Sequence, residues 1–225
     1  MRPLTPLLMG PHALLVEVGD GEEAGALHAE LLRRRECGEL PPVREIVPAA
    51  RTVLLDGLDD PRALASDIVR WDVPPLDSVP GRELRIPVRY DGPDLGDVAR
   101  LWKVRPEEVP EIVGAVRFRV AFCGFAPGFG YLTGLPERYR LPRRATPRTA
   151  VPAGSLALAG EYAGVYPRSS PGGWQLVGRT DTVLWDPARE PAALLAPGTR
   201  VRFAAEDPAA GDTGRAGPAE GHADD

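Results

Sequence analysis

Residues 124–136 read GFAPGFGYLTGLP, and residues 169–180 read SSPGGWQLVGRT. Both blocks place glycine and proline around aromatic side chains. Glycine permits positive φ angles and close backbone approach, and proline fixes φ at about −65°, so this punctuation predicts shaped loops rather than plain linkers. Because binding residues often lie on such loops, we expect a functional site here.

Arginine is concentrated around these two blocks. Between Ile112 and Thr180 the chain has nine arginines, no lysine and two acids, whereas the whole chain has a net charge of −5. Guanidinium groups stay charged and offer paired donors, so this surplus predicts contact with a phosphate or carboxylate ligand. An alternative stays open: Lys103 is the only lysine among 27 cationic residues, so arginine is simply the preferred cation of this chain.

Bulk composition predicts a soluble globular protein, with 225 residues and 43% hydrophobic content. The mild acidity and the lack of a basic run argue against a nucleic-acid partner. Two cysteines, Cys37 and Cys123, are too few for a disulfide framework or a zinc cluster, which favours the cytoplasm. Prolines interrupt the N-terminus, and glycines and prolines interrupt the uncharged run 120–136, so we expect neither a signal peptide nor a membrane span.

The first part of the chain predicts a small α/β sandwich over residues 1–80. Its expected elements follow from apolar periodicity, helix-capping residues and turn residues. They are strands at 13–18, 43–47 and 52–55, and helices at 22–35 and from Asp60 to about Trp71. The run of prolines and glycine over 74–81 is the expected domain boundary.

The second part predicts a closed or nearly closed β-barrel over residues 81–204. Expected strands are 83–90, 117–123, 155–159, 175–178, 183–185 and 200–203, and expected helices are 94–102 and one beginning at Pro106. Asp91 and Asp94 are expected to form a turn and cap the first of these helices. Residues 205–225 carry six acids and one arginine with few large apolar side chains, which predicts a disordered acidic tail.

Histidine is missing from the predicted barrel, since the three histidines are His12, His28 and His222. A Ser-His-Asp triad, a Cys-His pair and a histidine-based metal site are therefore excluded there. We interpret His28 as a residue of a helix face, and Cys123 as an inert buried thiol. Neither common nucleotide-binding glycine motif is present.

The remaining candidates are neutral polar groups, aromatic residues and arginines. Arg148 and Arg179 can clamp a charged ligand, and with Gln175 and Tyr131 they are the predicted catalytic residues. The predicted substrate-binding residues are Phe125, Ser155, Tyr166, Ser170, Gly172, Gly173 and Thr180. For the aromatic residues, simple packing within a core is the competing interpretation. No residues are assigned to a metal.

Four ordered blocks resemble a known family. Besides the two blocks quoted above, they are TPRTAVPAGS at 146–155 and GVYP at 164–167. Two shorter segments extend the same pattern, WDP at 185–187 and PGTRVRF at 197–203. They resemble the family called allophanate hydrolase subunit 1, which includes the B subunit of 5-oxoprolinase and the inhibitor of the sporulation histidine kinase. The resemblance extends to about residue 204. The chain departs from the family at Val113, where histidine is frequent, and at Gly130, where proline is usual.

This resemblance implies an α+β protein, with the N-terminal α/β domain followed by a cyclophilin-like β-barrel. It also implies two partners: a homologous C subunit, of the allophanate hydrolase subunit 2 type, and an A subunit of the lactam-utilisation type. Such an assembly resembles an ATP-dependent 5-oxoprolinase, a hydrolase that opens the lactam of 5-oxo-L-proline to L-glutamate, and this chain alone would be inactive. ATP and Mg²⁺ are the implied cofactors, shared with the partners because the predicted barrel has few carboxylates.

Two other functions share the same blocks. One is a binding protein that inhibits a histidine kinase, in which the barrel only provides a docking surface. The other is a carboxyl-transfer or allophanate hydrolase component of urea or amide metabolism, with biotin on a partner. A fold hosts many functions, so the resemblance by itself does not choose among the three.

Overall fold

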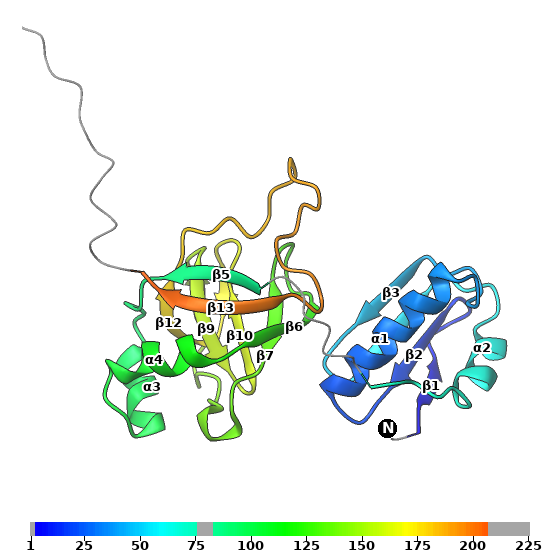
Figure 1. Ribbon diagram of the computed structural model, residues 1–225, viewed down its shortest axis with the longest axis horizontal. Helices are drawn as coiled ribbons and strands as arrows, with labels where there is room; N and C mark the ends of the chain where they lie inside the picture. Colours follow the sequence, from blue (N-terminus) through cyan, green and yellow to red (C-terminus); the bar gives the residue numbers. More distant parts are fainter. Residues whose placement is uncertain (1–2, 76–82, 207–225) are drawn as a thin grey trace, which may run out of the picture.

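The computed structural model describes residues 3–75 and 83–206, which form an N-terminal α/β domain and a C-terminal β-barrel domain (Figure 1). The predicted α+β class is confirmed. The predicted domain boundary at 80/81 and most of the predicted acidic tail lie outside the described residues.

A four-stranded antiparallel sheet forms the N-terminal domain, in the order β1-β2-β4-β3. Its elements are β1 (Thr5–Leu8), β2 (Ala13–Glu17), α1 (Gly21–Glu36), β3 (Glu45–Pro48), β4 (Thr52–Asp56) and α2 (Pro61–Ile68). Alternate residues of the central strands are buried, and they join the apolar faces of both helices in one core. Asp20 and Asp60 cap the two helices by accepting backbone hydrogen bonds of 2.9 to 3.1 Å.

Strand β1 is not among the expected elements. The structure places Pro6 in an edge strand, opposite Val16 of β2. Proline is tolerated there because an edge strand leaves some of its amides without a ladder partner.

The barrel domain is a seven-stranded sheet in the order β12-β9-β10-β7-β6-β13-β5, with a two-stranded ribbon, β11-β8, beside it. Its strands are β5 (Glu83–Val88), β6 (Phe118–Cys123), β7 (Gly130–Thr133), β8 (Arg148–Val151), β9 (Ser155–Ala159), β10 (Tyr162–Val165), β11 (Ser170–Gly172), β12 (Gln175–Arg179) and β13 (Arg200–Ala205). Its helices are α3 (Leu95–Trp102), α4 (Glu108–Ala115) and the short 3₁₀ helix η1 (Glu137–Tyr139).

Helices α3 and α4 pack against the core of the barrel. Val113, the position where the family frequently has histidine, is fully buried there. Pro110 lies in the first turn of α4, whose amides have no acceptor within the helix, so it removes no helical hydrogen bond. Helix α3 ends at Lys103, which has a φ of 58° in the left-handed region.

A seam of backbone hydrogen bonds joins the two edges of the nearly closed barrel, at β5 and β12. Arg89, which follows β5, and Arg179 of β12 exchange two backbone hydrogen bonds of 2.8 Å. The chain then stays against β12, because Gly92 donates to the Val177 carbonyl. A Cβ on Gly92 would lie 2.4 Å from the Leu176 oxygen, and one on Gly178 would lie 2.6 Å from the Arg89 oxygen. The seam therefore requires glycine on both sides.

Two details differ from the expected barrel. Residues 183–185 form no strand of the sheet; Trp185 makes an isolated bridge with Ala193 in a long loop. The guanidinium of Arg189 holds this loop by donating to four backbone carbonyls. Strand β13 also runs through Ala205, one residue beyond the predicted domain end, and the following Glu206 accepts a 3.2 Å hydrogen bond from Arg89.

In the described ranges 3–75 and 83–206, no helix combines the length and the apolar character needed to cross a membrane.

Candidate functional site

A cleft of about 600 Å³ lies along the seam of the barrel. It contains four of the predicted site residues: Arg148, Ser155, Arg179 and Thr180. The chain segments that contribute them are the turn after β5, strand β8, the start of β9 and the end of β12. The cleft is therefore built mainly from two of the sequence blocks, 146–155 and 170–180.

Gly154 brings these two blocks together. Its carbonyl accepts a 2.9 Å hydrogen bond from the Thr180 amide, and its own amide donates to the Tyr166 carbonyl at 2.7 Å. Gly154 has a φ of 78°, and a Cβ there would lie 2.2 Å from the Thr180 oxygen. Any larger residue would push the blocks apart and open the cleft.

Arg148 does not stand free in this cleft, because it is bound by the buried carboxylate of Asp94. Two nitrogens of Arg148 donate to Asp94 at 2.7 and 2.9 Å, and Arg144 donates to the same carboxylate at 2.6 Å. The Leu176 amide adds a fourth hydrogen bond at 2.7 Å. Asp94 is only 2% exposed. It occupies the expected N-cap position of α3, but its side chain makes no capping hydrogen bond, so that part of the expectation is wrong.

The electrostatics of Asp94 follow from these contacts. Burial alone would raise the pKa of Asp94, but the hydrogen bonds from Arg148 and the Leu176 amide outweigh it, helped by the charge of Arg144. The pKa of Asp94 therefore lies below its ordinary value, and the carboxylate stays charged. Two guanidinium groups share this one carboxylate, which leaves a positive charge beside the cleft.

Arg179 and Arg89 form more exposed ion pairs at the rim of the cleft. Arg179 contacts Asp91 at 2.6 Å, and Arg89 contacts Asp181 at 2.8 Å. Exposed pairs of this kind contribute little stability, so an anionic ligand can exchange with these carboxylates at small cost. The cleft can therefore bind and orient an anion.

The hydroxyl groups of the cleft are not activated as nucleophiles. Ser155 Oγ donates to the Pro152 carbonyl at 2.7 Å, and Thr180 Oγ1 lies 3.0 Å from the hydroxyl of Thr182. The histidines in the described part of the chain, His12 and His28, belong to the other domain. The chemistry that this cleft supports is binding and positioning rather than covalent catalysis.

The predicted aromatic residues form a second layer on the outer face of the barrel. Phe129, Tyr166 and Trp174 are buried there beneath the β8-β11 ribbon. Tyr131 packs edge-on against Phe129 at 5.0 Å between ring centres, and burial raises the pKa of Tyr166. Gly172 packs directly against this layer, since a Cβ there would lie 2.3 Å from the Tyr166 hydroxyl. These residues pack with one another, and the cleft along the seam does not include them.

The other predicted residues, Ser170, Gly173 and Gln175, lie outside the cleft. Ser170 Oγ donates to the Arg168 carbonyl at 3.2 Å, and the Gly173 carbonyl accepts from the Arg144 amide at 2.7 Å. Gln175 is buried and donates to the Pro142 carbonyl at 3.2 Å. Its Oε1 has no hydrogen-bond partner among the described residues. Unlike Arg148, none of these groups reaches the cleft.

Phe125 is the exposed end of the aromatic layer. Its side chain is 56% exposed, and its φ of 68° is a conformation that costs a non-glycine residue about 1 to 2 kcal/mol. Pro127 of the same turn is also exposed, and Trp185 packs beside Gly128 with its side chain 43% exposed. We name these residues the Phe125 patch, together with Val183, which is 60% exposed and two positions before Trp185 in the sequence: Phe125, Pro127, Val183 and Trp185.

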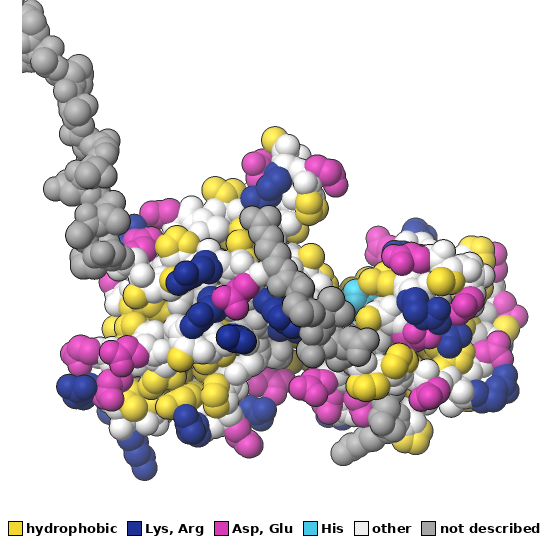
Figure 2. Space-filling model, in the orientation of Figure 1, with side chains coloured by type: hydrophobic (Ala, Val, Ile, Leu, Met, Phe, Trp, Pro, Cys, Tyr) yellow, Lys and Arg dark blue, Asp and Glu magenta, His cyan; other side chains and the backbone are white. Residues whose placement is uncertain are grey.

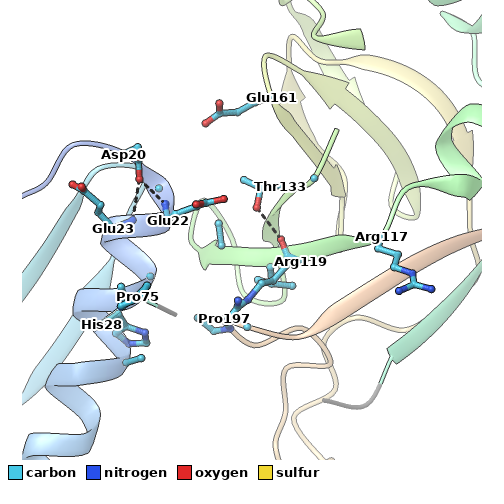
Figure 3. Close-up of a pocket in the computed structure, with 18 of the residues that line it drawn as sticks. Asp20, Glu22, Glu23, His28, Pro75, Arg117, Arg119, Thr133, Glu161 and Pro197 are labelled. Atoms are coloured by element: carbon cyan, nitrogen blue, oxygen red, sulfur yellow. Dashed lines mark hydrogen bonds between the residues drawn. The ribbon is translucent and has the colours of Figure 1, made fainter. Parts of the chain in front are cut away.

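A second, larger cleft of about 1010 Å³ lies between α1 and β6. Figure 3 shows Arg119 extending toward α1 and His28, whereas Arg117 extends away from them. His28 is half-buried on the helix face, and burial together with Arg35 lowers its pKa. Sequence reasoning missed this cleft, because its walls come from separate domains and no motif links them.

Among the described residues, no three His, Cys, Asp or Glu side chains are placed to hold a metal ion together. The carboxylates nearest the seam, Asp91, Asp94 and Asp181, are all bound by arginines. This donor set does not fit Mg²⁺, which prefers several free oxygen ligands. No step of the function is therefore assigned to a metal held by these residues.

Comparison with known proteins identifies relatives over most of the chain. The family model described as "Carboxyltransferase domain, subdomain C and D" matches residues 5–195. The 5-oxoprolinase B subunit of Escherichia coli O157:H7 is 42% identical over 73% of this chain and 79% of that protein. The 5-oxoprolinase B subunit of Bacillus subtilis is 46% identical over 54% of this chain and 52% of that protein.

Solved structures are also similar to this chain over most of its length. TTHA0988 superposes with a TM-score of 0.72 at 35% identity, over 87% of this chain but only 40% of its own length. PH0987 from Pyrococcus horikoshii matches with a TM-score of 0.55 at 32% identity, over 92% of this chain and 99% of its own. Urea amidolyase of K. lactis, at 21% identity, shows the shared fold alone. On its sequence blocks, its barrel and these relatives, the chain belongs to the carboxyltransferase-domain family, subdomains C and D, together with the 5-oxoprolinase B subunits.

Proposed function

We propose that this chain is the B subunit of an ATP-dependent 5-oxoprolinase that opens 5-oxo-L-proline to L-glutamate. The observation that carries the proposal is its identity of 42 to 46% with curated 5-oxoprolinase B subunits. The seam cleft supports it, because Arg89, Arg148 and Arg179 offer guanidinium groups to the carboxylate of the substrate or to a phosphorylated intermediate.

The chain acts within a complex in this proposal. Its seam cleft contains no activated nucleophile and no metal site among the described residues, so ATP and Mg²⁺ are expected on surfaces shared with the A and C subunits. The contribution of this chain is to hold the anion and to exclude water around it. Its cytoplasmic location is part of the same proposal.

Reconstitution tests this function directly. All combinations of the three purified subunits are incubated with ATP, Mg²⁺ and 5-oxoproline, and glutamate and phosphate release are measured. We expect this chain alone to be inactive and the three subunits together to couple both reactions. Glutamate formation by the A and C subunits without this chain would exclude the proposed role.

Arg179 and Arg148 give a finer test of the cleft. Arg179→Ala should lower the activity of the complex at least tenfold while leaving the fold intact, because its side chain is 60% exposed. Arg148→Ala should lower activity as well, and should also destabilise the barrel because it unpairs Asp94. Arg100→Ala, which removes a more exposed cation from α3, is the control.

For the C subunit, we propose that its homologous barrel docks on the Phe125 patch. An exposed aromatic residue held in a costly backbone conformation beside other exposed apolar side chains is typical of an interface anchor. Phe125→Ser with Trp185→Ser should abolish co-elution with the C subunit in size-exclusion chromatography. Leu101→Ser, at an apolar side chain 50% exposed on α3, should leave co-elution unchanged.

A further inference from the structure

The outer face of strands β6, β13 and β5 carries a group of neighbouring arginines at one end. Alternate residues of these strands, such as Phe118, Val201 and Ile86, point into the barrel core. The residues between them must point outward. On this side we find the set that we name the arginine face: Arg85, Arg117, Arg119, Arg200 and Arg202.

Strand register arranges the arginine face in two rows. In the first row, Arg200 of β13 lies between Glu83 of β5 and Arg119 of β6. In the second row, Arg202 lies opposite Arg85. Because Val201 pairs with Phe118 in an antiparallel ladder, the next step along the strands brings Arg117 beside Arg202. Figure 2 shows several dark blue side chains over this part of the barrel, with magenta and white between them.

This arrangement is unfavourable for the isolated chain. Like charges directly opposite each other on neighbouring strands destabilise a sheet, and the second row places three guanidinium groups side by side. Glu83 is the one acid of the two rows. In the part of the chain that the structure describes, no carboxylate forms an ion pair with Arg85, Arg117 or Arg202; Arg202 instead donates to the Gly114 carbonyl at 3.4 Å. An anionic partner would remove this repulsion.

The shape of the face favours a protein surface over a small anion. Small ligands bind in concave sites, and a large cleft beside α1 borders this face. That cleft is lined by Arg117 and Arg119 but not by Arg85 or Arg202. A single phosphate bound there would leave the second row largely uncovered.

The surroundings of the face also disfavour a nucleic acid. The opposite wall of the same cleft carries Asp20, Glu22 and Glu23 of the α1 N-terminal segment (Figure 3). A long phosphate backbone lying along the arginine face would meet these acids, whereas a folded protein can present carboxylates only where the arginines are.

We propose that the arginine face is the docking surface for an acidic surface of one of the other subunits of the enzyme. This proposal rests on the proposed function. The aromatic layer covers the outside of β7, β9, β10 and β12, and the arginine face covers β5, β6 and β13, so the two halves of the sheet differ in outer chemistry. The chain can therefore engage one partner through apolar contacts and another through charge at the same time.

The experiment compares Arg85→Gln/Arg117→Gln with the matched control Arg51→Gln/Arg62→Gln. All four side chains are exposed, and the control removes the same charge from the N-terminal domain. Binding to the purified A and C subunits and to a fluorescent octaglutamate peptide is measured at about 50 and about 300 mM salt, where screening differs strongly. Single-stranded DNA and inorganic phosphate are the competing probes.

We expect the Arg85/Arg117 variant to bind octaglutamate and its acidic partner at least tenfold more weakly at low salt, with less salt dependence. The control should stay within twofold of wild type. The thermal stability of the Arg85/Arg117 variant should equal or exceed that of wild type, since its substitutions remove repulsion between neighbouring strands and break no ion pair of the described residues.

Unchanged binding by the Arg85/Arg117 variant would overturn the proposal, as would tighter wild-type binding of single-stranded DNA or phosphate than of octaglutamate. If wild type binds neither of the two purified partners, the proposed function fails, and octaglutamate binding still decides whether the face accepts acidic protein. Loss of glutamate formation with normal binding of both partners would place these arginines in the reaction instead of in docking and would also overturn the proposal.

Discussion

Asp94 joins three parts of the barrel that are far apart in the sequence. It precedes α3, accepts from arginines 50 and 54 residues further on, and accepts from the backbone of β12. Buried ion pairs of this kind fix geometry more than they add stability, because desolvation of the charges opposes their attraction. Loss of one member is nevertheless costly, since the other charges then lack a partner.

Asp94→Asn should therefore destabilise the barrel by about 3 to 5 kcal/mol, because Arg144 and Arg148 would remain partly buried without a carboxylate. Urea denaturation followed by tryptophan fluorescence measures the change. Asp97→Asn is the control, since Asp97 and its partner Arg100 are 51% and 76% exposed and should contribute less than about 1 kcal/mol. Equal losses in the two variants would contradict a structural role for Asp94.

Glu30 gives the N-terminal domain a defined response to acid. The hydrogen bond from Arg33 is the largest cause that lowers the pKa of Glu30 to about 2; burial opposes it, and Arg34 assists it. A carboxyl group with a depressed pKa stabilises the fold at neutral pH and loses this contribution as the pH falls. The pH window of this loss lies between 4.5, the ordinary pKa of the glutamate side chain, and about 2, its pKa in the folded protein.

The difference in stability between wild type and Glu30→Gln should shrink as the pH is lowered through this window. Urea midpoints of both proteins, measured at several pH values from about 6 to about 2.5, test the expectation. Other acids titrate equally in both proteins, so the difference isolates Glu30. A constant difference across the window would show that its charge is not what stabilises the domain.

At the scale of single residues, the sequence indicated the arginines of the cleft but not the carboxylates that bind them. The surplus of arginine over 112–180 and the family blocks pointed to Arg148 and Arg179, and the structure places both at one cleft. The carboxylate of Asp94 could not be assigned, because an Asp before a helix is normally a cap, and its burial depends on the tertiary fold.

At the scale of elements, strong periodicity was the reliable signal. Helices α1, α2 and α3 and strands β2, β4 and β6 coincide with expected elements, because each has a regular buried face. Strand β9 also coincides with an expected strand, but as a short apolar run that is buried at every residue. Strands β7, β8, β10 and β11 are only three or four residues long and contain glycine or proline, or begin next to one. They are strands because they hydrogen-bond to neighbouring strands, and their own sequences show no clear strand pattern.

The seam offers a sharp test of backbone contact between elements. Gly92→Ala should destabilise the barrel by about 1 to 3 kcal/mol or more, because the added methyl group would overlap the backbone of β12. Gly96→Ala is the matched control within α3, where nothing lies within 4 Å of the added atom; it should stabilise the protein by about 0.5 to 1 kcal/mol. Thermal unfolding of both variants gives the comparison, and a neutral Gly92→Ala would mean that the seam is loose.

At the scale of the molecule, the two domains have separate interiors. One buried cluster belongs wholly to the N-terminal domain, and the other two belong wholly to the barrel. Parts of a chain that share a buried core unfold together. These two domains do not share one, so each should unfold as a separate cooperative unit.

Fragments 1–75 and 83–206 should each fold when expressed alone, and their melting curves should account for the transitions of the full chain. Circular dichroism measures the melting curves of both fragments and of the full chain. Trp71 reports on the N-terminal fragment, where the Arg34 guanidinium lies 3.9 Å from its ring centre. A fragment without a cooperative transition would show that its domain depends on the other for stability.

Lys103, at the left-handed end of α3, is the only lysine in the chain and is exposed. Amine-reactive reagents can therefore modify only this side chain and the free N-terminal amine. Besides the N-terminal amine, a fluorophore or a cross-linker attached through such chemistry would mark one known point on the barrel, between α3 and α4. Distances measured from that point to labelled partner proteins would orient the barrel within an assembly without any introduced cysteine.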